Sequence, residues 1–513
     1  MNRTTMALGG AAVSLTLLTG VAALAAPSDS DEAGPATRRL PVERTTLVCP
    51  QPTDSEVAQT TYTGFSPSGG GSTKGQAELL PVDDAENAGD EGGKDKKDKK
   101  EKKKGKKKPK KPQPDKPVVP LKEPGAPVKA ERDKANGPAL VGTAEGRFAP
   151  GWTVQQTTLV RAGDGRGALG TACSVPDTEF TFPGASTAED RQDYVHLTNP
   201  DDTGAVVDLE LHGKEGRLDT PSGEGVNVPP RSTVPVLLSS LTSKPSTNVT
   251  LHVTSRSGRV GALVRASDEK LGGDWISAAG DARPSAVLPG IPGDAKEVRL
   301  MVYAPGEQDA DLKLKLAGKS GSITPAGHET LHVKGGMTTA VDLGPLTRGQ
   351  AGSLVLTPSG QGGQTPVVAA LRVVRGKGQG RESAFVTSTP PLAKRATAAD
   401  NRAKGGELSL TAPEKAVRVR ITASKGTAGG TASSTTVTVR GGTTTAMSTP
   451  KPKGGKGSYA VTVERLSGGQ LYAARTLKLP LKGVSAFTTQ TLPDDQSTVA
   501  VPSADQDLSV LHD

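Results

Sequence analysis

The chain has 513 residues, with 63 Lys or Arg against 54 Asp or Glu, which gives a net charge of +9. It contains two cysteines and no CxxC pattern, which excludes a cysteine-rich zinc module and a dithiol redox site. Only 2 Trp, 5 Tyr and 6 Phe are present, so few aromatic rings remain to stack against sugars or nucleobases.

The N-terminal segment, residues 1–26, has the pattern of an export signal. Arg3 provides a positive start, residues 7–26 are uncharged and mostly apolar, and Ala23 and Ala25 are small residues of the kind that a signal peptidase recognises. The apolar run is also long enough to cross a bilayer, so a retained membrane anchor stays open beside a cleaved signal peptide. Either way, we expect an extracytoplasmic protein, secreted or anchored to the cell membrane by this N-terminal helix.

A short strand candidate at residues 44–50 lies in the segment 27–65, and a long polar segment follows at residues 66–136. The polar segment has few large apolar side chains, so it cannot bury enough surface to offset its chain entropy. We therefore predict a disordered, Lys-rich linker over residues 66–136. At its centre, residues 94–111 hold 13 Lys against 3 acidic residues, a net charge of 13 − 3 = +10.

Because the whole chain carries +9, the residues outside this lysine run sum to −1, and the basic charge belongs to the linker. One interpretation is an extended, self-repelling spacer. The other is adhesion to an anionic cell-wall polymer or to lipid head groups. Nucleic acid is not an expected partner, because the run has no interleaved aromatic residues and the chain is exported. The candidate polyanion-binding residues are Lys96, Lys97, Lys99, Lys100, Lys102, Lys103, Lys104, Lys106, Lys107 and Lys108.

The two cysteines, Cys49 and Cys173, stand on either side of this linker. An even pair in an oxidising compartment is expected to form a disulfide. Such a bond would attach the strand at residues 44–49 to a first β region at residues 137–190 and leave the lysine segment as an insertion.

The remainder of the chain repeats with a period of about 105 residues. This offset places Leu209 and Leu211 on Leu314 and Leu316, and a more divergent third copy aligns around residues 437–444. A fixed period indicates an array of similar units. Within each copy apolar and polar residues alternate in short runs bounded by Gly, Pro, Asn or Asp, which is typical of antiparallel strands.

We therefore predict an all-β protein of tandem antiparallel sandwiches of the immunoglobulin or fibronectin type. The expected units are residues 137–190 joined to 40–65, then repeats at 191–283, 284–390 and 391–513. One buried aromatic residue closes each repeat, namely Trp275, Phe385 and Phe487. A strand at residues 497–501 is expected to complete the last sheet.

The first repeat carries a recognisable set of short motifs, at residues 182–187 (FPGAST), 195–200 (VHLTNP) and 226–232 (VNVPPRS). These motifs resemble the signature of an uncharacterised actinobacterial secreted family, domain of unknown function 5719. The second repeat keeps the turn Leu288-Pro289-Gly290 but replaces Asn-Pro by Ala304-Pro305. The resemblance implies a location and an architecture, and it supplies no catalytic residues.

Two enzyme-like motifs are explained better by the repeat. Residues 328–332 spell HExxH, yet they align with strand sequence in the other copies, and in a strand residues four apart lie about 13 Å from each other, too far to share one zinc ion. Gly165, Gly167 and Gly170 spell GxGxxG without a following helix, so we read them as loop glycines. The Asn199 to Asp202 stretch is expected to be a hairpin turn.

The histidines His196, His212 and His252 are expected at outward-facing strand positions on the surface. No catalytic residues, metal ligands or cofactor are therefore predicted. The sequence favours a non-enzymatic cell-envelope protein with a structural, adhesion or assembly role. The alternative is a module that binds an anionic cell-wall polymer or glycan, through the lysine tether or through a groove between sandwiches.

Overall fold

The computed structural model describes residues 38–69, 74–84, 116–133, 137–360 and 364–501. These residues fall into two units. In one of them β1 (Arg38–Pro41) pairs with β36 (Thr498–Val501); the other spans residues 41–497 and is all-β. The predicted export helix at 1–26 and the lysine residues 96–108 lie outside the described ranges. No helix in the described part of the chain is long and apolar enough to cross a membrane.

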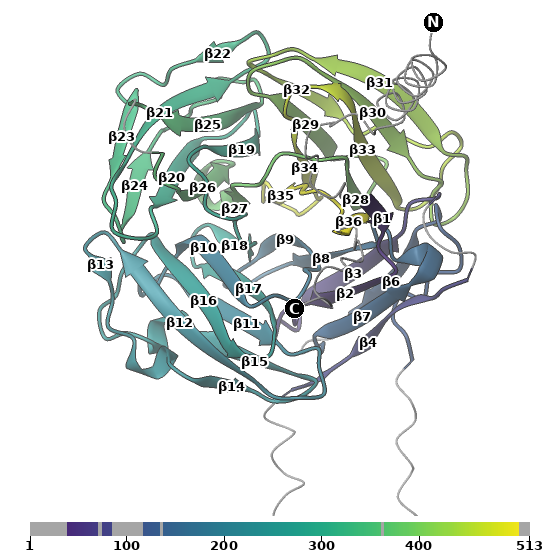
Figure 1. The fold of residues 1–513 in the computed structure, drawn as a ribbon, viewed down its shortest axis with the longest axis horizontal. Coiled ribbons are helices and arrows are strands. Elements are labelled where there is room, and N and C mark those ends of the chain that lie inside the picture. Colours follow the sequence, from purple (N-terminus) through teal and green to yellow (C-terminus); the bar gives the residue numbers. More distant parts are fainter. Residues whose placement is uncertain (1–37, 70–73, 85–115, 134–136, 361–363, 502–513) are drawn as a thin grey trace, which may run out of the picture. The chain divides into compact units, whose positions relative to one another are not determined.

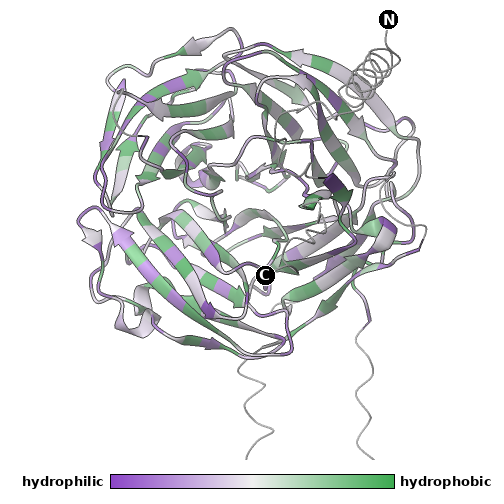
Figure 2. Ribbon diagram, in the orientation of Figure 1, coloured by the Kyte–Doolittle hydropathy of each residue, from purple (hydrophilic) through white to green (hydrophobic). Residues whose placement is uncertain are grey.

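Within residues 41–497 the strands form four two-sheet sandwiches, numbered 1 to 4 in chain order (Figure 1). The strands inside them pair antiparallel, as the alternating apolar pattern predicts, apart from the short parallel pair β5 and β15; an isolated parallel bridge also joins Ala304 and Gly335. Along strands such as β12 and β16 hydrophobic and hydrophilic residues alternate (Figure 2), and the hydrophobic ones form the core between the two sheets. Among the described residues four short 3-10 turns lie between strands, η2 (Gly146–Phe148), η3 (Pro221–Gly223), η4 (Leu238–Ser240) and η5 (Gly378–Gly380).

Sandwich 1 combines the two sides of the lysine insertion. One sheet has the order β2 (Arg44–Cys49), β7 (Leu140–Glu145), β4 (Ala77–Pro81), and the other β6 (Val128–Arg132), β3 (Ala58–Phe65), β8 (Thr153–Val160), β9 (Gly167–Ala172). The prediction of a single disordered segment over 66–136 is therefore wrong for residues 74–84 and 116–133. Leu79, Val119 and Leu121 are buried in this core, and these few apolar residues are enough to order their segments.

Sandwich 2 begins earlier than the predicted boundary at residue 191, because its first strand precedes it. One sheet contains β10 (Glu179–Ala185), β16 (Val249–Ser257), β12 (Ala205–Gly213), β13 (Gly216–Arg217) and β14 (Val226–Val228). The other contains β18 (Gly272–Ile276), β17 (Gly261–Asp268), β11 (Tyr194–Thr198), β15 (Ser232–Leu237) and β5 (Asp83–Asp84).

Sandwich 3 repeats this plan about 105 residues later, as the sequence period predicts. One sheet contains β19 (Ala286–Ile291), β25 (Gly352–Pro358), β21 (Ala310–Ala317), β22 (Ser322–Ile323) and β23 (Thr330–Val333). The other has β24 (Thr338–Asp342), β20 (Glu297–Tyr303), β26 (Val368–Arg375) and β27 (Glu382–Thr387).

Sandwich 4 is the divergent third copy. One sheet has β28 (Arg395–Asn401), β33 (Tyr459–Gly468), β30 (Val417–Ala423) and β31 (Ser433–Val439). The other has β32 (Thr443–Ser448), β29 (Gly406–Ala412), β34 (Tyr472–Lys478) and β35 (Phe487–Thr491). The strand near residues 497–501 does not complete this sheet, contrary to prediction, because β36 pairs with β1 instead.

The four sandwiches contact one another in a closed cycle. The first strand of each packs on a sheet of the next: β2 contacts β17, β10 contacts β26, β19 contacts β34, and β28 of sandwich 4 contacts β8 of sandwich 1. The ends of this folded unit also meet, since the Val42 amide donates a hydrogen bond to the Ser497 carbonyl at 3.1 Å. Sandwiches 1 and 4 are therefore neighbours although they lie at opposite ends of the sequence.

The aromatic residue that closes each repeat is buried, as predicted, but two of the three fill the core of the preceding sandwich. Phe385 of sandwich 3 belongs to the core of sandwich 2, and Phe487 of sandwich 4 belongs to the core of sandwich 3. Trp275 packs between sandwiches 1 and 2, against Leu169 and Leu263. These side chains join successive units into one body.

Replacing one of these buried aromatic residues by a smaller one is expected to lower the stability of the fold measurably. Phe487→Leu should lower the free energy of unfolding by about 1–2 kcal/mol, because the smaller side chain leaves part of a fully buried site empty. Urea titration followed by far-UV circular dichroism would measure the change. The matched control is Ile323→Ala, at a 54% exposed position on β22, which should change stability by no more than about 0.5 kcal/mol. An unchanged midpoint for Phe487→Leu would contradict the packing.

Candidate functional site at the centre of the four sandwiches

One strand from each sandwich meets its counterparts at the centre of the cycle. These central strands, β9, β18, β27 and β35, each form the edge of a sheet, and each contacts two of the others. Three glycines allow the approach on the sandwich 1 side. A Cβ atom on Gly165 would lie 2.5 Å from the Ser267 hydroxyl, one on Gly167 would lie 2.1 Å from a Glu382 carboxylate oxygen, and one on Gly170 would lie 2.4 Å from a Thr488 methyl group. The GxGxxG motif therefore provides close contact to sandwiches 2, 3 and 4 in turn.

Two carboxylates, Asp274 on β18 and Glu382 on β27, are buried among these strands. Asp274 Oδ1 accepts hydrogen bonds from the backbone amides of Gly170 and Trp275 at 2.9 and 2.8 Å. Glu382 Oε1 accepts one from the Ala168 amide at 2.6 Å. Each carboxylate thus accepts a hydrogen bond from a backbone amide of the neighbouring central strand β9. These bonds support a role in holding the edge strands together.

Burial dominates the protonation of both groups. It raises the pKa of Glu382 to about 8, against the opposing effect of its backbone hydrogen bonds. It also raises the pKa of Asp274 well above the ordinary value, again against its backbone hydrogen bonds, and the nearby Glu382 adds to the rise. At neutral pH we therefore expect Glu382 to carry its proton.

A pH dependence of stability follows from the raised pKa of Glu382. The folded protein holds this proton more tightly than the unfolded chain, so the stabilisation is complete below the unfolded pKa near 4.5 and is lost as pH rises through about 8. Across this window the free energy of unfolding should fall by up to about 1.4 kcal/mol per pH unit for one proton. Glu382→Gln, which resembles the protonated form, should flatten this slope in urea titrations at pH 5 to 9. Glu215→Gln, at an exposed position, serves as the control. If wild type and Glu382→Gln showed the same dependence of the free energy of unfolding on pH, the raised pKa of Glu382 would be refuted.

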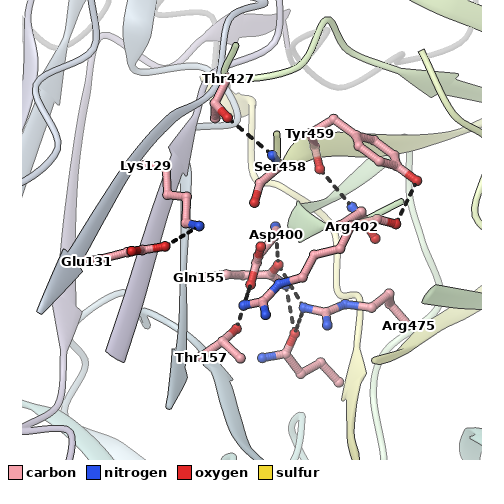
Figure 3. A network of polar contacts seen from close by, with 12 residues as sticks. Lys129, Glu131, Gln155, Thr157, Asp400, Arg402, Thr427, Ser458, Tyr459 and Arg475 are labelled. Carbon is pink, nitrogen blue, oxygen red and sulfur yellow. Dashed lines mark hydrogen bonds and ion pairs between the residues drawn. The ribbon is translucent and has the colours of Figure 1, made fainter. Parts of the chain in front are cut away.

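The contact of sandwich 4 with sandwich 1, called here the closing junction, is built from polar side chains (Figure 3). Asp400 lies in the irregular end of β28, and its Oδ2 accepts hydrogen bonds from Thr157 at 2.9 Å and from Arg402 at 3.2 Å. The backbone amide of Asp400 donates to Gln155 Oε1 at 2.7 Å. At the two preceding junctions the corresponding bulge position is a glycine, Gly184 or Gly290.

Arg475 connects the closing junction to the core of sandwich 4. It pairs across the sheet with the core residue Leu408, so its side chain extends from a core-facing position and is fully buried. Its Nη2 donates to Gln155 Oε1 at 2.9 Å and to Gln490 Oε1 at 2.6 Å. The two glutamines also bond to each other at 2.8 Å.

The charges of the closing junction support one another. Burial alone would raise the pKa of Asp400, but the guanidinium groups of Arg402 and Arg475 and the hydrogen bond from Thr157 outweigh it and hold the pKa below the ordinary value. Burial lowers the pKa of Arg475 to about 10, opposed by Asp400 and Asp274. Both side chains therefore remain charged at neutral pH and attract each other in a water-poor setting.

The arrangement of these buried charged residues is suited to holding the sandwiches together. Arg475, Asp400 and Glu382 are fully buried and Asp274 is 1% exposed, so a solute in the surrounding water does not reach them. Most of their hydrogen bonds join one sandwich to another. The chemistry that these residues support best is the attachment of four sandwiches to each other.

The disulfide expected from the sequence is present. Cys49 at the end of β2 is bonded to Cys173 just after β9, across 124 residues of chain. Strand β2 pairs with β7 over its whole length, so the N-terminal strand is part of the first sandwich. A disulfide of this kind indicates an oxidising compartment.

The HExxH residues do not lie on a helix. His332 lies on strand β23 and His328 precedes that strand, as the repeat predicts. The His332 ring contacts two carboxylates, with Nδ1 at 2.8 Å from Asp311 Oδ1 and Nε2 at 3.4 Å from Asp309 Oδ2. The Asn199 to Asp202 stretch is a turn between β11 and β12, in which the Asn199 side chain donates to the Thr203 and Val228 carbonyls at 2.7 and 3.1 Å.

Two of the three histidines predicted at the surface are buried instead. His196 packs its ring edge against Trp275 at 5.4 Å between centroids, because the face of β11 opposite the core is covered by other parts of the unit. His212 is covered by Tyr303 of sandwich 3, with ring centroids 4.8 Å apart. Burial lowers the pKa of both imidazoles, most strongly that of His196. His252 is half-buried.

The sequence profile of DUF5719, a family of unknown function, matches residues 128–450, which is more than half of the chain. The chain belongs to the DUF5719 family. A comparison with curated proteins finds no match.

The DUF5719 match locates the central residues relative to the family. It begins at strand β6, includes all of sandwich 3 and all of sandwich 2 except β5, and ends after strand β32. Asp274, Glu382 and Asp400 lie within the matched range, and Arg475 and Gln490 lie beyond it. Sequence reasoning missed all five residues. The available signal was the placement of Asp274 directly before Trp275 and of Glu382 three residues before Phe385, since the aromatic plugs mark the central strands.

Proposed function

We propose that the protein is a non-enzymatic extracytoplasmic cell-envelope protein whose four joined sandwiches act as a rigid structural or assembly scaffold. The observation that carries the proposal is the closed cycle of contacts, in which the buried charged groups form hydrogen bonds across the junctions between sandwiches. A chain of loosely connected domains would not need such junctions. A scaffold requires them, because fixed spacing between its surfaces depends on them.

The location part of the proposal has two supports. Residues 1–26 have the composition of an export signal or membrane anchor. The disulfide between Cys49 and Cys173 is of the type that persists outside the reducing cytoplasm. Both are consistent with a protein that is secreted or held at the outer side of the cell membrane.

Crosslinking followed by mass spectrometry on intact cells tests the proposal directly. The expected result is an exported, oxidised protein whose crosslinks extend to other envelope components, with crosslinks between sandwiches 1 and 4 inside the chain. A reduced protein in the cytoplasmic fraction would contradict the location. A Glu382→Gln variant that keeps its stability and its crosslinks but does not replace the wild-type protein in cells would contradict the scaffold role. The carboxyl group would then act chemically.

A second candidate function rests on the lysine insertion. Residues 94–111 carry a net charge of +10, and the chain enters the segment after β5 and leaves it before β6, so both ends are attached to the folded unit. We propose binding to an anionic cell-wall polymer through this segment. Retention of the purified protein on isolated cell wall should fall as salt is raised and should be lost when residues 94–111 are deleted. Equal retention of the deletion variant would exclude this function.

A further inference from the structure

Among the described residues, one cluster of His and Glu side chains of the kind that can hold a metal ion lies outside the central site, on the outer face of the β10-β16-β12 sheet. Glu210 and His212 are two residues apart on β12, so they project from the same face. His252 on β16 is the direct cross-strand partner of Glu210. The candidate ligand atoms of these three residues lie within 4.8 Å of one another.

The imidazole of His212 is oriented for a ligand. Its Nδ1 lies 3.3 Å from the carbonyl oxygen of Gly336, in the loop before β24 of sandwich 3. A carbonyl oxygen can only accept a hydrogen bond, so Nδ1 carries the hydrogen and Nε2 holds a lone pair. That Nε2 atom is buried without a hydrogen-bond partner among the described residues. A backbone carbonyl that fixes one ring nitrogen while the other faces the ion is a common arrangement at protein metal sites.

Charged neighbours border the cluster on both sides. Arg217 Nη2 contacts Glu210 Oε1 at 3.0 Å, whereas Glu210 Oε2 faces His212 Nε2 at 3.6 Å. On the other side, His252 Nε2 lies 3.0 Å from Oε1 of Glu179 on β10. One carboxylate oxygen is therefore held by an arginine, and a second carboxylate adjoins the site.

We propose that Glu210, His212 and His252 bind one divalent transition-metal ion of the zinc class, with Glu179 or water as the fourth ligand. Two imidazoles and a carboxylate are a donor set that zinc accepts readily. Ligand distances of about 2.0–2.2 Å require the three side chains to close by a small rotamer movement. Because His212 is held by sandwich 3, the ion would reinforce the junction between sandwiches 2 and 3.

Calorimetric titration of the full-length, oxidised and chelator-treated protein with zinc chloride tests this proposal. We expect one ion per chain, and with cobalt chloride we expect the visible absorption of a tetrahedral site. His252→Ala and Glu210→Gln should each weaken zinc binding by at least about tenfold. Thermal unfolding of the metal-free variants shows that they are folded.

His332→Ala is the matched control, because His332 also lies on a strand beside two carboxylates, those of Asp309 and Asp311. This variant should bind zinc like the wild type. The proposal is overturned if the wild-type protein does not bind zinc, if His252→Ala and Glu210→Gln retain full affinity, or if His332→Ala loses it.

Discussion

Replacing Arg475 by methionine is expected to lower the free energy of unfolding by about 3–4 kcal/mol. The substitution removes one hydrogen-bond donor from each of Gln155 and Gln490 and one of the two cations that stabilise the buried Asp400 carboxylate. Methionine fills a similar volume, so most of the loss should come from the weaker stabilisation of the buried Asp400 charge and from the hydrogen bonds lost at the two glutamines, which keep each other and the Asp400 amide as partners. Urea titration with fluorescence and circular dichroism would measure it.

Two further variants separate this effect from the effect of removing any arginine side chain. Arg420→Met removes an exposed guanidinium that pairs with Glu464, and it should cost no more than about 1 kcal/mol. In Arg475→Met combined with Asp400→Asn, the second change removes the charge left behind, so the total should be less than the sum of the two single effects. Strict additivity would show that Arg475 and Asp400 do not interact in the folded protein.

Removal of the disulfide is the second large effect. Cys49→Ala with Cys173→Ala should lower the free energy of unfolding by about 4–5 kcal/mol, because the bond closes a loop of 124 residues and limits the unfolded chain. Chemical denaturation of the double variant and of reduced wild-type protein should give the same loss. Thiol titration of denatured, unreduced wild type should detect no free thiol.

The lysine insertion provides an internal control for this explanation. Deletion of residues 94–111 shortens the closed loop by 18 residues, and the logarithmic dependence on loop length predicts a change of only about 0.1–0.2 kcal/mol in the contribution of the bond. A wild-type midpoint in the double cysteine variant would refute the loop-closure argument. So would a large decrease in the contribution of the disulfide after the deletion.

The repeat predicted much of the fold, because a strand pattern copied at a fixed offset must form the same sheets. The alternation of Leu209 and Leu211 correctly predicted which side of β12 faces the core. It could not show what covers the opposite side. His196 illustrates this limit: it alternates with Val195 and Leu197 as a surface residue would, yet it is buried against Trp275. The alternation shows which residues share a face of the strand, but it does not show which face contacts solvent.

The central residues were missed for a related reason. Glu382, Asp400 and Arg475 are ordinary charged residues in local sequence, and their burial against residues of other sandwiches, such as Ala168, Thr157 and Gln155, distinguishes them only in the folded structure. The composition of the 66–136 segment was misleading in a similar way. Averaged over its lysines it is too polar to fold, although Val119 and Leu121 at its end pack into sandwich 1.

The hydrogen bond between Val42 and Ser497 bears on how this architecture can change. Because the beginning and end of the folded unit touch, a short peptide could join them and new termini could be opened in a turn such as the one at Gly306, giving a circularly permuted protein that still folds. Loss of a whole sandwich is a different matter. A linear array of domains can lose one member. In a closed cycle, the loss of one sandwich would expose the contact faces of its two neighbours, so the number of sandwiches is fixed by geometry.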